Sequence, residues 1–262
     1  MKSLYLFIGC LIALSWQSLS AQMHINPDTA VVTQHQTTIK GVAMSYHATT
    51  GNQPVWDEQG NPIAAVNYTY YERDGIKDRS TRPLVISFNG GPGTASVWMQ
   101  IAYTGPVLLN LDDEGNPVQP YGLGNNPYSI LDVADIVYVN PVNTGYSRIL
   151  NENVDRKQFF GVNEDVTYLA KWITTFVTRV NRWTSPKYLI GESYGTTRVS
   201  GLAQELQSRH QLFLNGVVLV SPTELGIRRD GPVDEALTLP YMAATAWYHK
   251  VLPNDLQQKD LL

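Results

Sequence analysis

Residues 188–195, with the sequence Tyr-Leu-Ile-Gly-Glu-Ser-Tyr-Gly, constrain the fold of this chain more than any other stretch. The apolar run 187–190 predicts a short buried strand. The apolar residues that follow recur at the spacing of one helical face, and they are Val199, Leu202, Ala203 and Leu206. Between the two lies Gly-x-Ser-x-Gly, with Ser193 at its centre. The sequence therefore predicts a strand that turns sharply into a helix.

The two glycines of this motif have a steric reason. A turn this sharp holds Ser193 in strained backbone geometry, and a Cβ at Gly191 or Gly195 would strike the neighbouring strand or helix. The Ser193 hydroxyl is then exposed at a helix N-terminus, where backbone N–H groups stabilise a developing oxyanion. Ser193 is therefore a candidate nucleophile. Taken alone, the motif also fits an ordinary strand-to-helix turn with a surface serine.

Three further apolar runs, 84–88, 136–139 and 216–220, predict short buried strands. A helical stripe lies between the second and the candidate serine, with Asn163 as its expected N-cap. Its members are Val166, Leu169, Ala170, Ile173, Val177 and Val180. Strands that alternate with helices predict an α/β fold, with a mostly parallel sheet and helices on both faces.

The N-terminal third predicts other features. Residues 22–36 are polar and aperiodic, which indicates a loose tail. The β-rich runs 37–49 and 63–71 predict an antiparallel pair, and residues 51–54 and 57–62 between them have the composition of turns. Residues 112–117, Asp-Asp-Glu-Gly-Asn-Pro, resemble the second of these turns. Neither has the spacing of a calcium loop, so we expect tight turns with a left-handed glycine.

The first 21 residues predict an export signal. Lys2 is followed by a largely apolar stretch over 4–16 and by small residues up to Ala21, with cleavage expected before Gln22. The apolar stretch is short for a membrane span, so no stable membrane anchor is expected, although an uncleaved anchor is the alternative. The mature protein is then periplasmic or extracellular. Cys10 is the only cysteine, so disulfides and thiolate metal sites are not expected in the mature chain.

Size and charge limit the function further. A chain of 262 residues with a formal net charge of −4 fits one sizeable α/β domain, and its mild acidity argues against a nucleic-acid partner. A second glycine-rich segment, Asn-Gly-Gly-Pro-Gly over 89–93, follows the strand 84–88. It lacks the Gly-Lys-Ser/Thr of a phosphate-binding loop and the glycine pattern of a dinucleotide fold. No cofactor is therefore expected, and in Gly-x-Ser-x-Gly hydrolases such a loop supplies the second oxyanion donor.

Four motifs in order resemble the serine carboxypeptidase family, which has the α/β-hydrolase fold. They are Asn-Gly-Gly-Pro-Gly at 89–93, Asn-Pro-Tyr-Ser at 126–129, Pro-Val-Asn-Thr-Gly-Tyr-Ser at 141–147 and Gly-Glu-Ser-Tyr-Gly at 191–195. The resemblance covers about residues 83–221, and the sequence in and around the motifs is most similar to the bacterial branch. It implies a hydrolase that releases C-terminal residues from peptides through an acyl-enzyme.

The resemblance also implies roles for particular residues. Ser193 would be the nucleophile, and the amides of Gly91 and Tyr194 would form the oxyanion hole. Asn89, the amide of Gly90 and a protonated Glu192 would bind the C-terminal carboxylate of the substrate. The proton on Glu192 avoids a clash of like charges and would favour acidic pH.

The sequence departs from the family at Tyr103. A glutamate occupies the matching position in the family and shares a proton with the glutamate of the nucleophile motif. A phenol donates one hydrogen bond but does not share a proton in that way. Tyr103 therefore leaves the reaction open between a carboxypeptidase and an esterase or acyltransferase of the same fold, with a peptide or an acyl compound as substrate.

The triad is the second departure. In this fold the acid and the histidine follow the nucleophile, and only His210 and His249 follow Ser193. His210 is expected about 25 Å away at the far end of the helix, and His249 lies in what resembles a helical insertion. We therefore expect the fold to be truncated, with 37–225 as the N-terminal part of the hydrolase domain, 226–262 as the start of a cap, and the triad Asp and His beyond Leu262. A catalytically inactive fragment or binding remnant is the alternative.

Overall fold

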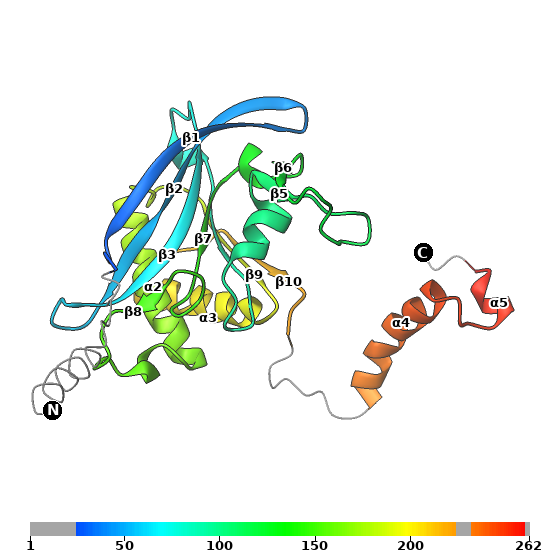
Figure 1. Cartoon of the computed structure of the whole chain (residues 1–262). Helices are drawn as coiled ribbons and strands as arrows, with labels where there is room; N and C mark the ends of the chain where they lie inside the picture. Colours follow the sequence, from blue (N-terminus) through cyan, green and yellow to red (C-terminus); the bar gives the residue numbers. More distant parts are fainter. Residues whose placement is uncertain (1–24, 224–231, 260–262) are drawn as a thin grey trace, which may run out of the picture. The chain divides into compact units, whose positions relative to one another are not determined.

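The structure, a computed structural model, describes residues 25–223 and 232–259 (Figure 1). The predicted export signal in residues 1–21 lies outside the described residues. The chain forms two compact units, Met1–Pro222 and Thr223–Leu262, and each is described by itself.

An eight-stranded sheet forms the centre of the first unit. Its order is β1-β2-β3-β7-β4-β9-β10, with β8 paired to β3. The strands are β1 (Thr29–Ile39), β2 (Val42–Trp56), β3 (Pro62–Arg73), β4 (Leu84–Phe88), β7 (Asp135–Val139), β8 (Arg148–Ile149), β9 (Lys187–Glu192) and β10 (Gly216–Val220). The four apolar runs predicted as strands are β4, β7, β9 and β10, and they pair in parallel. The predicted burial of 216–220 was wrong, since residues 217–219 of β10 are exposed at the edge of the described sheet. The predicted antiparallel pair is β2 with β3.

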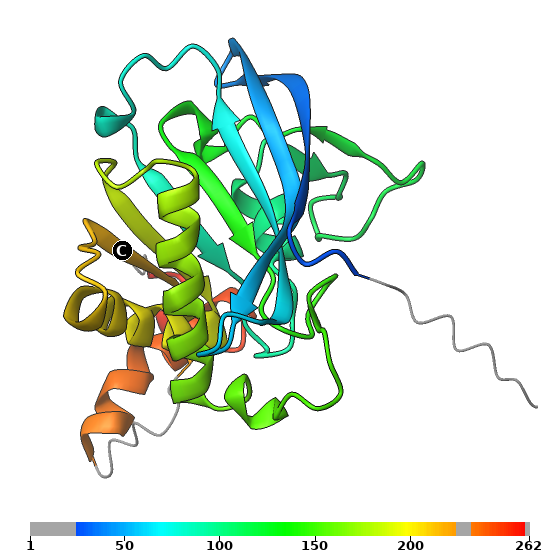
Figure 2. The same cartoon turned by 90° about the vertical axis from the view of Figure 1, so that its left-hand side faces the viewer.

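Helices cover both faces of this sheet, as predicted. One face carries α2 (Val162–Arg179) and α3 (Tyr194–Arg209), and Figure 2 shows α2 running along it. Here Trp172 and Phe176 of α2 stack on each other and meet Tyr68 of β3 edge-on. The other face carries a second apolar cluster that includes Met99 and Leu131, from the π-helix η2 (Met99–Thr104) and the 3-10 helix η3 (Ile130–Asp132).

Three further local predictions were wrong. Residues 29–36, expected in a loose tail, form most of β1, which pairs residue by residue with β2. The signal was weak because β1 is an exposed strand with no apolar alternation. Residues 51–54, expected as a turn, lie inside β2, where Gly51 makes room for β1, since a Cβ there would be 2.3 Å from the Thr29 carbonyl oxygen. Gly161, and not Asn163, is the N-cap of α2.

The two tight turns form as predicted and are built alike. The Asp57 carboxylate accepts hydrogen bonds from the amides of Gln59 and Asn61, at 3.0 and 2.8 Å. The Asp112 carboxylate makes the equivalent two bonds with the amides of Glu114 and Asn116. Gly60 and Gly115 have φ values of 83° and 84°, the left-handed region that glycine adopts without strain.

A buried charge cluster lies at the amino ends of β4 and β7. Asp135 is 1% exposed and accepts from Arg82 Nε at 2.8 Å and from Arg182 Nη1 at 2.6 Å. The amide of Arg73 also donates to this carboxylate, at 2.9 Å. Arg182 is fully buried and donates further to the Tyr70 hydroxyl and to the Arg82 carbonyl. The cluster therefore ties three neighbouring strands to the segment that follows α2.

The remaining short elements of the first unit are η1 (Arg79–Thr81), β5 (Val107–Leu109), β6 (Leu123–Asn125) and η4 (Arg156–Gln158). The second unit holds α4 (Pro232–Tyr248) and α5 (Asn254–Gln257). Trp247 and Gln257 join these two helices through two reciprocal hydrogen bonds of 3.2 and 2.9 Å. The expectation that residues 226–262 are the start of a cap stays a prediction. Within the described residues, every helix is too short or too polar to cross a membrane.

Candidate active site

Ser193 occupies the turn between β9 and α3. It is a non-glycine residue with φ 56° and ψ −125°, a conformation that costs about 1–3 kcal/mol and persists only where its surroundings enforce it. Two sets of contacts enforce it here. Its amide donates to the Val220 carbonyl at the end of β10, and its carbonyl accepts from the amide and the hydroxyl of Thr196. The sheet and the first turn of the helix therefore fix the backbone of Ser193.

The flanking glycines are needed for the reason predicted from the sequence. A Cβ on Gly191 would lie 2.1 Å from the Gly195 carbonyl oxygen. A Cβ on Gly195 would lie 3.0 Å from the carbonyl oxygen of Phe88, the last residue of β4. Both contacts are with backbone atoms, which do not move aside as a flexible side chain does. Glycine at these two positions lets the strand, the turn and the helix approach closely.

The glycine loop, residues 89–93, follows β4 and lies directly on this turn. A Cβ on Gly90 would be 2.6 Å from the Tyr194 nitrogen and 2.9 Å from the Ser193 Cβ. Gly91 has φ 105°, and the Gly90 carbonyl accepts from the Thr94 amide at 3.1 Å. In a trans peptide the N–H points away from the carbonyl of the same unit, so the Gly91 amide is directed away from Thr94. The structure thus brings Gly90 and Tyr194 together beside Ser193, with Gly91 next along the loop.

Asn89 and Glu192 also meet. The Asn89 Nδ2 donates to Glu192 Oε2 at 3.1 Å, and the Asn89 Oδ1 accepts from the Met99 amide at 3.0 Å. Asn89 is 1% exposed, whereas Glu192 is half-buried. The buried amide therefore connects the carboxyl group of the serine motif to the first residue of η2.

Tyr103 lies on η2 but is not joined to these two residues. Its side chain is 54% exposed, and its hydroxyl has no hydrogen-bond partner among the described residues. The contact that it does make is through its carbonyl, which accepts from Asn126 Nδ2 at 2.9 Å. Tyr103 therefore does not take the place of a carboxyl partner for Glu192.

Within the described residues of the first unit, the histidines lie at the far end of α3 or on β1 and β2. His210 is the C-cap of α3, at the opposite end of that helix, as predicted. His35 stacks on Tyr46, and His47 Nδ1 pairs with Asp74 at 2.5 Å. His24 lies outside the described residues and His249 belongs to the second unit. Within residues 25–223 and 232–259, the structure also has no group of three or more His, Cys, Asp and Glu that could hold a metal ion.

Sequence reasoning gave no role to Arg198 or Asp165, yet both lie beside the glycine loop. Arg198 Nε donates to Asp165 Oδ2 at 2.7 Å, and both side chains are buried. Burial raises the pKa of the Asp165 carboxyl above its ordinary value, and the Arg198 guanidinium acts in the opposite direction. The sequence did hold one signal for this pair. Arg198 adjoins Val199 on the buried face of α3, and a buried charge is very costly without a partner, so a carboxylate partner could have been expected.

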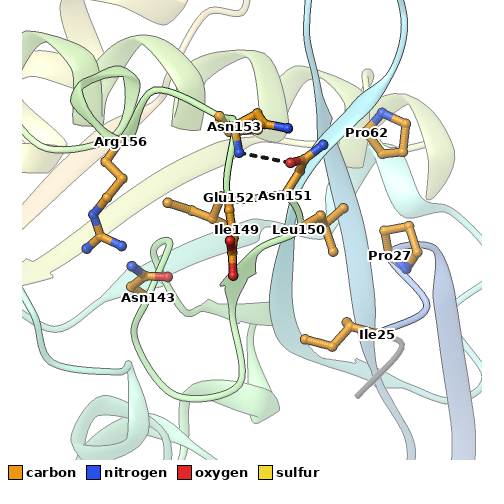
Figure 3. Close-up of a pocket in the computed structure, with 11 residues that line it drawn as sticks. Ile25, Pro27, Pro62, Asn143, Ile149, Leu150, Asn151, Glu152, Asn153 and Arg156 are labelled. Carbon is orange, nitrogen blue, oxygen red and sulfur yellow. Dashed lines mark hydrogen bonds between the residues drawn. The ribbon is translucent and has the colours of Figure 1, made fainter. Parts of the chain in front are cut away.

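Two cavities lie near these elements. One of about 290 Å³ is lined by Tyr194, Pro92 and Phe160, among others, with Arg198 and Asp165 in its wall. The other, of about 900 Å³, lies along residues 149–154, and Figure 3 shows Asn143 and Arg156 on one side of it and Pro27 and Pro62 on the other. Asn143 lines both cavities. The smaller cavity is the one that adjoins the serine turn.

Comparison with known proteins decides the family. Residues 58–259 match the family model described as serine carboxypeptidase. The chain belongs to the serine carboxypeptidase family. Serine carboxypeptidase-like 36 from Arabidopsis thaliana is 31% identical over 160 residues, which are 59% of this chain and 31% of that protein. Serine carboxypeptidase-like 16 from the same plant is 29% identical over 176 residues, or 64% of this chain and 39% of that protein.

This serine carboxypeptidase family member therefore spans about a third of the length of these curated relatives. Both are plant proteins, so the predicted likeness to the bacterial branch is not confirmed. Among solved structures, a prohormone-processing carboxypeptidase from Saccharomyces cerevisiae matches with a TM-score of 0.55 and 18% identity. The match covers 81% of this chain and 49% of that chain. The likeness confirms the predicted α/β-hydrolase fold.

Proposed function

We propose that the protein is a serine-type carboxypeptidase that releases C-terminal residues from peptides through an acyl-enzyme on Ser193. The observation that carries the proposal is the close approach of the glycine loop to the serine turn, where the Cβ position of Gly90 is 2.6 Å from the Tyr194 nitrogen. Two segments that are distant in sequence thus meet at Ser193. Family membership supports the same reaction class.

In the proposed reaction, Ser193 Oγ attacks the carbonyl carbon of the last peptide bond. The amides of Gly91 and Tyr194 stabilise the resulting oxyanion, at typically about 3 kcal/mol per donor. The C–N bond then breaks, the leaving amine takes the proton that the hydroxyl gave up, and water hydrolyses the ester to free Ser193. We infer that the histidine and aspartate for these proton transfers come from sequence that follows Leu262, so that residues 1–262 alone are inactive.

The substrate's C-terminal carboxylate is proposed to bind Asn89, the Gly90 amide and Glu192. The support is the bond between Asn89 and Glu192, which puts an amide donor and a carboxyl group side by side. We also propose that the protein is exported, on the basis of the signal-like residues 1–21, and that its partners are peptides and not nucleic acids.

A phosphonate that reacts with activated serines tests the nucleophile. In the protein expressed from its whole reading frame, we expect one adduct, on the peptide that contains Ser193, and none in Ser193→Ala. Ser200→Ala, an exposed serine on the same helix, is the matched control and keeps the adduct. Peptide mass spectrometry locates the label. An adduct on any other residue, or an unlabelled Ser193 in a protein that cleaves peptides, contradicts the proposal.

A second candidate is an esterase or acyltransferase of the same fold. It is favoured by Tyr103, whose exposed hydroxyl is not joined to Glu192. Rates on free-acid peptides and on the same peptides with amidated C-termini separate the two. A carboxypeptidase is expected to prefer the free acid by on the order of 100-fold or more, because a site built for a polar group rejects the analogue that lacks it. Equal rates favour the second candidate.

A further inference from the structure

Arg198 joins three parts of the candidate site with one buried side chain. It lies on α3, five residues after Ser193, and it is 1% exposed. Besides its bond to Asp165 on α2, its Nη1 donates to the Asn89 carbonyl at 2.9 Å and its Nη2 to the Pro92 carbonyl at 3.3 Å. The helix that begins at the serine turn therefore holds both ends of the glycine loop.

These contacts fix the direction of particular amides. The Asn89–Gly90 peptide is trans, so a carbonyl that points at Arg198 turns the Gly90 N–H to the opposite side. The bond to the Pro92 carbonyl orients the Gly93 N–H in the same way. Gly90 is the residue whose amide is proposed to bind the substrate, and it also lies against the Tyr194 nitrogen. Arg198 thus acts on the binding groups from the side of the loop that faces the protein interior.

The guanidinium is itself held in one orientation. It is planar with donors in a fixed fork, which suits one carboxylate and two carbonyls at the same time. The rings of Phe88 and Tyr194 lie 5.6 and 5.2 Å from its central carbon, which packs the group between β4 and the start of α3. Asp165 neutralises its charge. Because the side chain is held on every side, it fixes the position of the glycine loop relative to α3.

We propose that Arg198 is a positioning residue, which sets the orientation of the Gly90 amide and holds the glycine loop on the serine turn. It touches no substrate, so its effect on the reaction is indirect. The role of the loop in substrate binding rests on the proposed function, but the coupling of Arg198 to the loop does not. Asp165 has a separate task, to neutralise the guanidinium.

Amide hydrogen exchange of the full chain tests this coupling without any need for activity. Arg198→Met alone leaves Asp165 buried without its partner, so the decisive variant is the double replacement Arg198→Met with Asp165→Asn, which removes both charges. We expect the Thr94 amide, which donates to the Gly90 carbonyl across the loop, to exchange at least about tenfold faster, while the amides of β4, β9 and α2 keep their rates. Arg209→Met, an exposed arginine at the end of the same helix, is the matched control and changes nothing.

Two further variants test the proposal, and two results of the double variant would overturn it. Asp165→Asn alone keeps Arg198 on the two carbonyls, so the loop should stay protected. Arg198→Lys should restore part of the protection, since one ammonium does not reach all three acceptors. The proposal is overturned if the double variant leaves loop exchange unchanged, or if exchange rises equally in the whole sheet, which marks an ordinary structural ion pair.

The link to substrate is tested separately on the active protein. The double variant should raise KM for free-acid peptides more than it lowers kcat, because the misdirected Gly90 amide weakens binding of the carboxylate. Amidated peptides should show no such increase in KM. If the wild-type protein fails to label at Ser193, the proposed function is wrong, while the exchange result still decides the role of Arg198. If KM is unchanged although the loop is mobile, Arg198 positions the loop but not the carboxylate site.

Discussion

Replacement of Asp135 by alanine is expected to lower the free energy of unfolding by about 3–5 kcal/mol, because it removes one partner of a buried ion pair. Asp135 is the carboxylate that accepts from both Arg82 and Arg182 in the described structure. Without it, two buried guanidinium groups face each other across the start of β7. Guanidinium chloride unfolding, followed by circular dichroism, measures the loss.

The control for this prediction is Asp113→Ala. Asp113 is exposed in the tight turn of residues 112–117, and its removal is expected to change the unfolding free energy by less than about 0.5 kcal/mol. A result for Asp135→Ala within about 1 kcal/mol of the wild type contradicts the account. It would mean that water reaches the two arginines in the variant and replaces the carboxylate.

Replacement of Gly191 by alanine is the second change with a large expected effect. The new Cβ would lie 2.1 Å from the Gly195 carbonyl oxygen, so the serine turn and the start of α3 must move apart. We expect the free energy of unfolding to fall by about 3 kcal/mol, at the upper end for overpacking because the clash is with backbone. We also expect the phosphonate adduct on Ser193 to disappear. Unfolding curves and peptide mass spectrometry measure the two effects.

Gly93→Ala is the matched control, since a Cβ at Gly93 meets no atom within 4 Å. This glycine of the neighbouring glycine loop should accept alanine with no more than about 0.5 kcal/mol of change and with labelling intact. The steric account of the serine turn fails if Gly191→Ala is as stable and as readily labelled as the wild type.

The parallel part of the sheet could be predicted because its strands are continuous apolar runs, the pattern typical of strands that are buried on both faces. β4, β7 and β9 are buried in this way, whereas β10 has the same pattern but is largely exposed in the described structure. The serine turn could be predicted because its two glycines report close backbone contacts. β1 could not, since an exposed strand that pairs through its backbone needs no apolar alternation. Gly51 and Gln53 have the composition of a turn, yet both lie within β2. Gly51 leaves room for β1 to pair, and the Gln53 side chain donates a hydrogen bond to the Trp172 carbonyl of α2.

Within the candidate site, the motifs predicted a glycine loop close to the serine turn, but not what holds the loop in place. Arg198 and Asp165 lie 33 residues apart and meet only after α2 and α3 have packed together. Single-sequence patterns carry no record of such a pair. The position of Tyr103 was also beyond reach, because π-helical geometry sets which side chains of η2 are exposed.

The hydrogen bond from the Ser193 amide to the Val220 carbonyl has a consequence for the edge of the sheet. β10 is one of the two edge strands of the sheet as described. Its last hydrogen bond is to Ser193, the residue proposed to carry out the chemistry. Fraying of this edge strand would therefore act directly on the backbone of Ser193. β10 therefore helps to hold the backbone conformation of Ser193, in addition to completing the sheet.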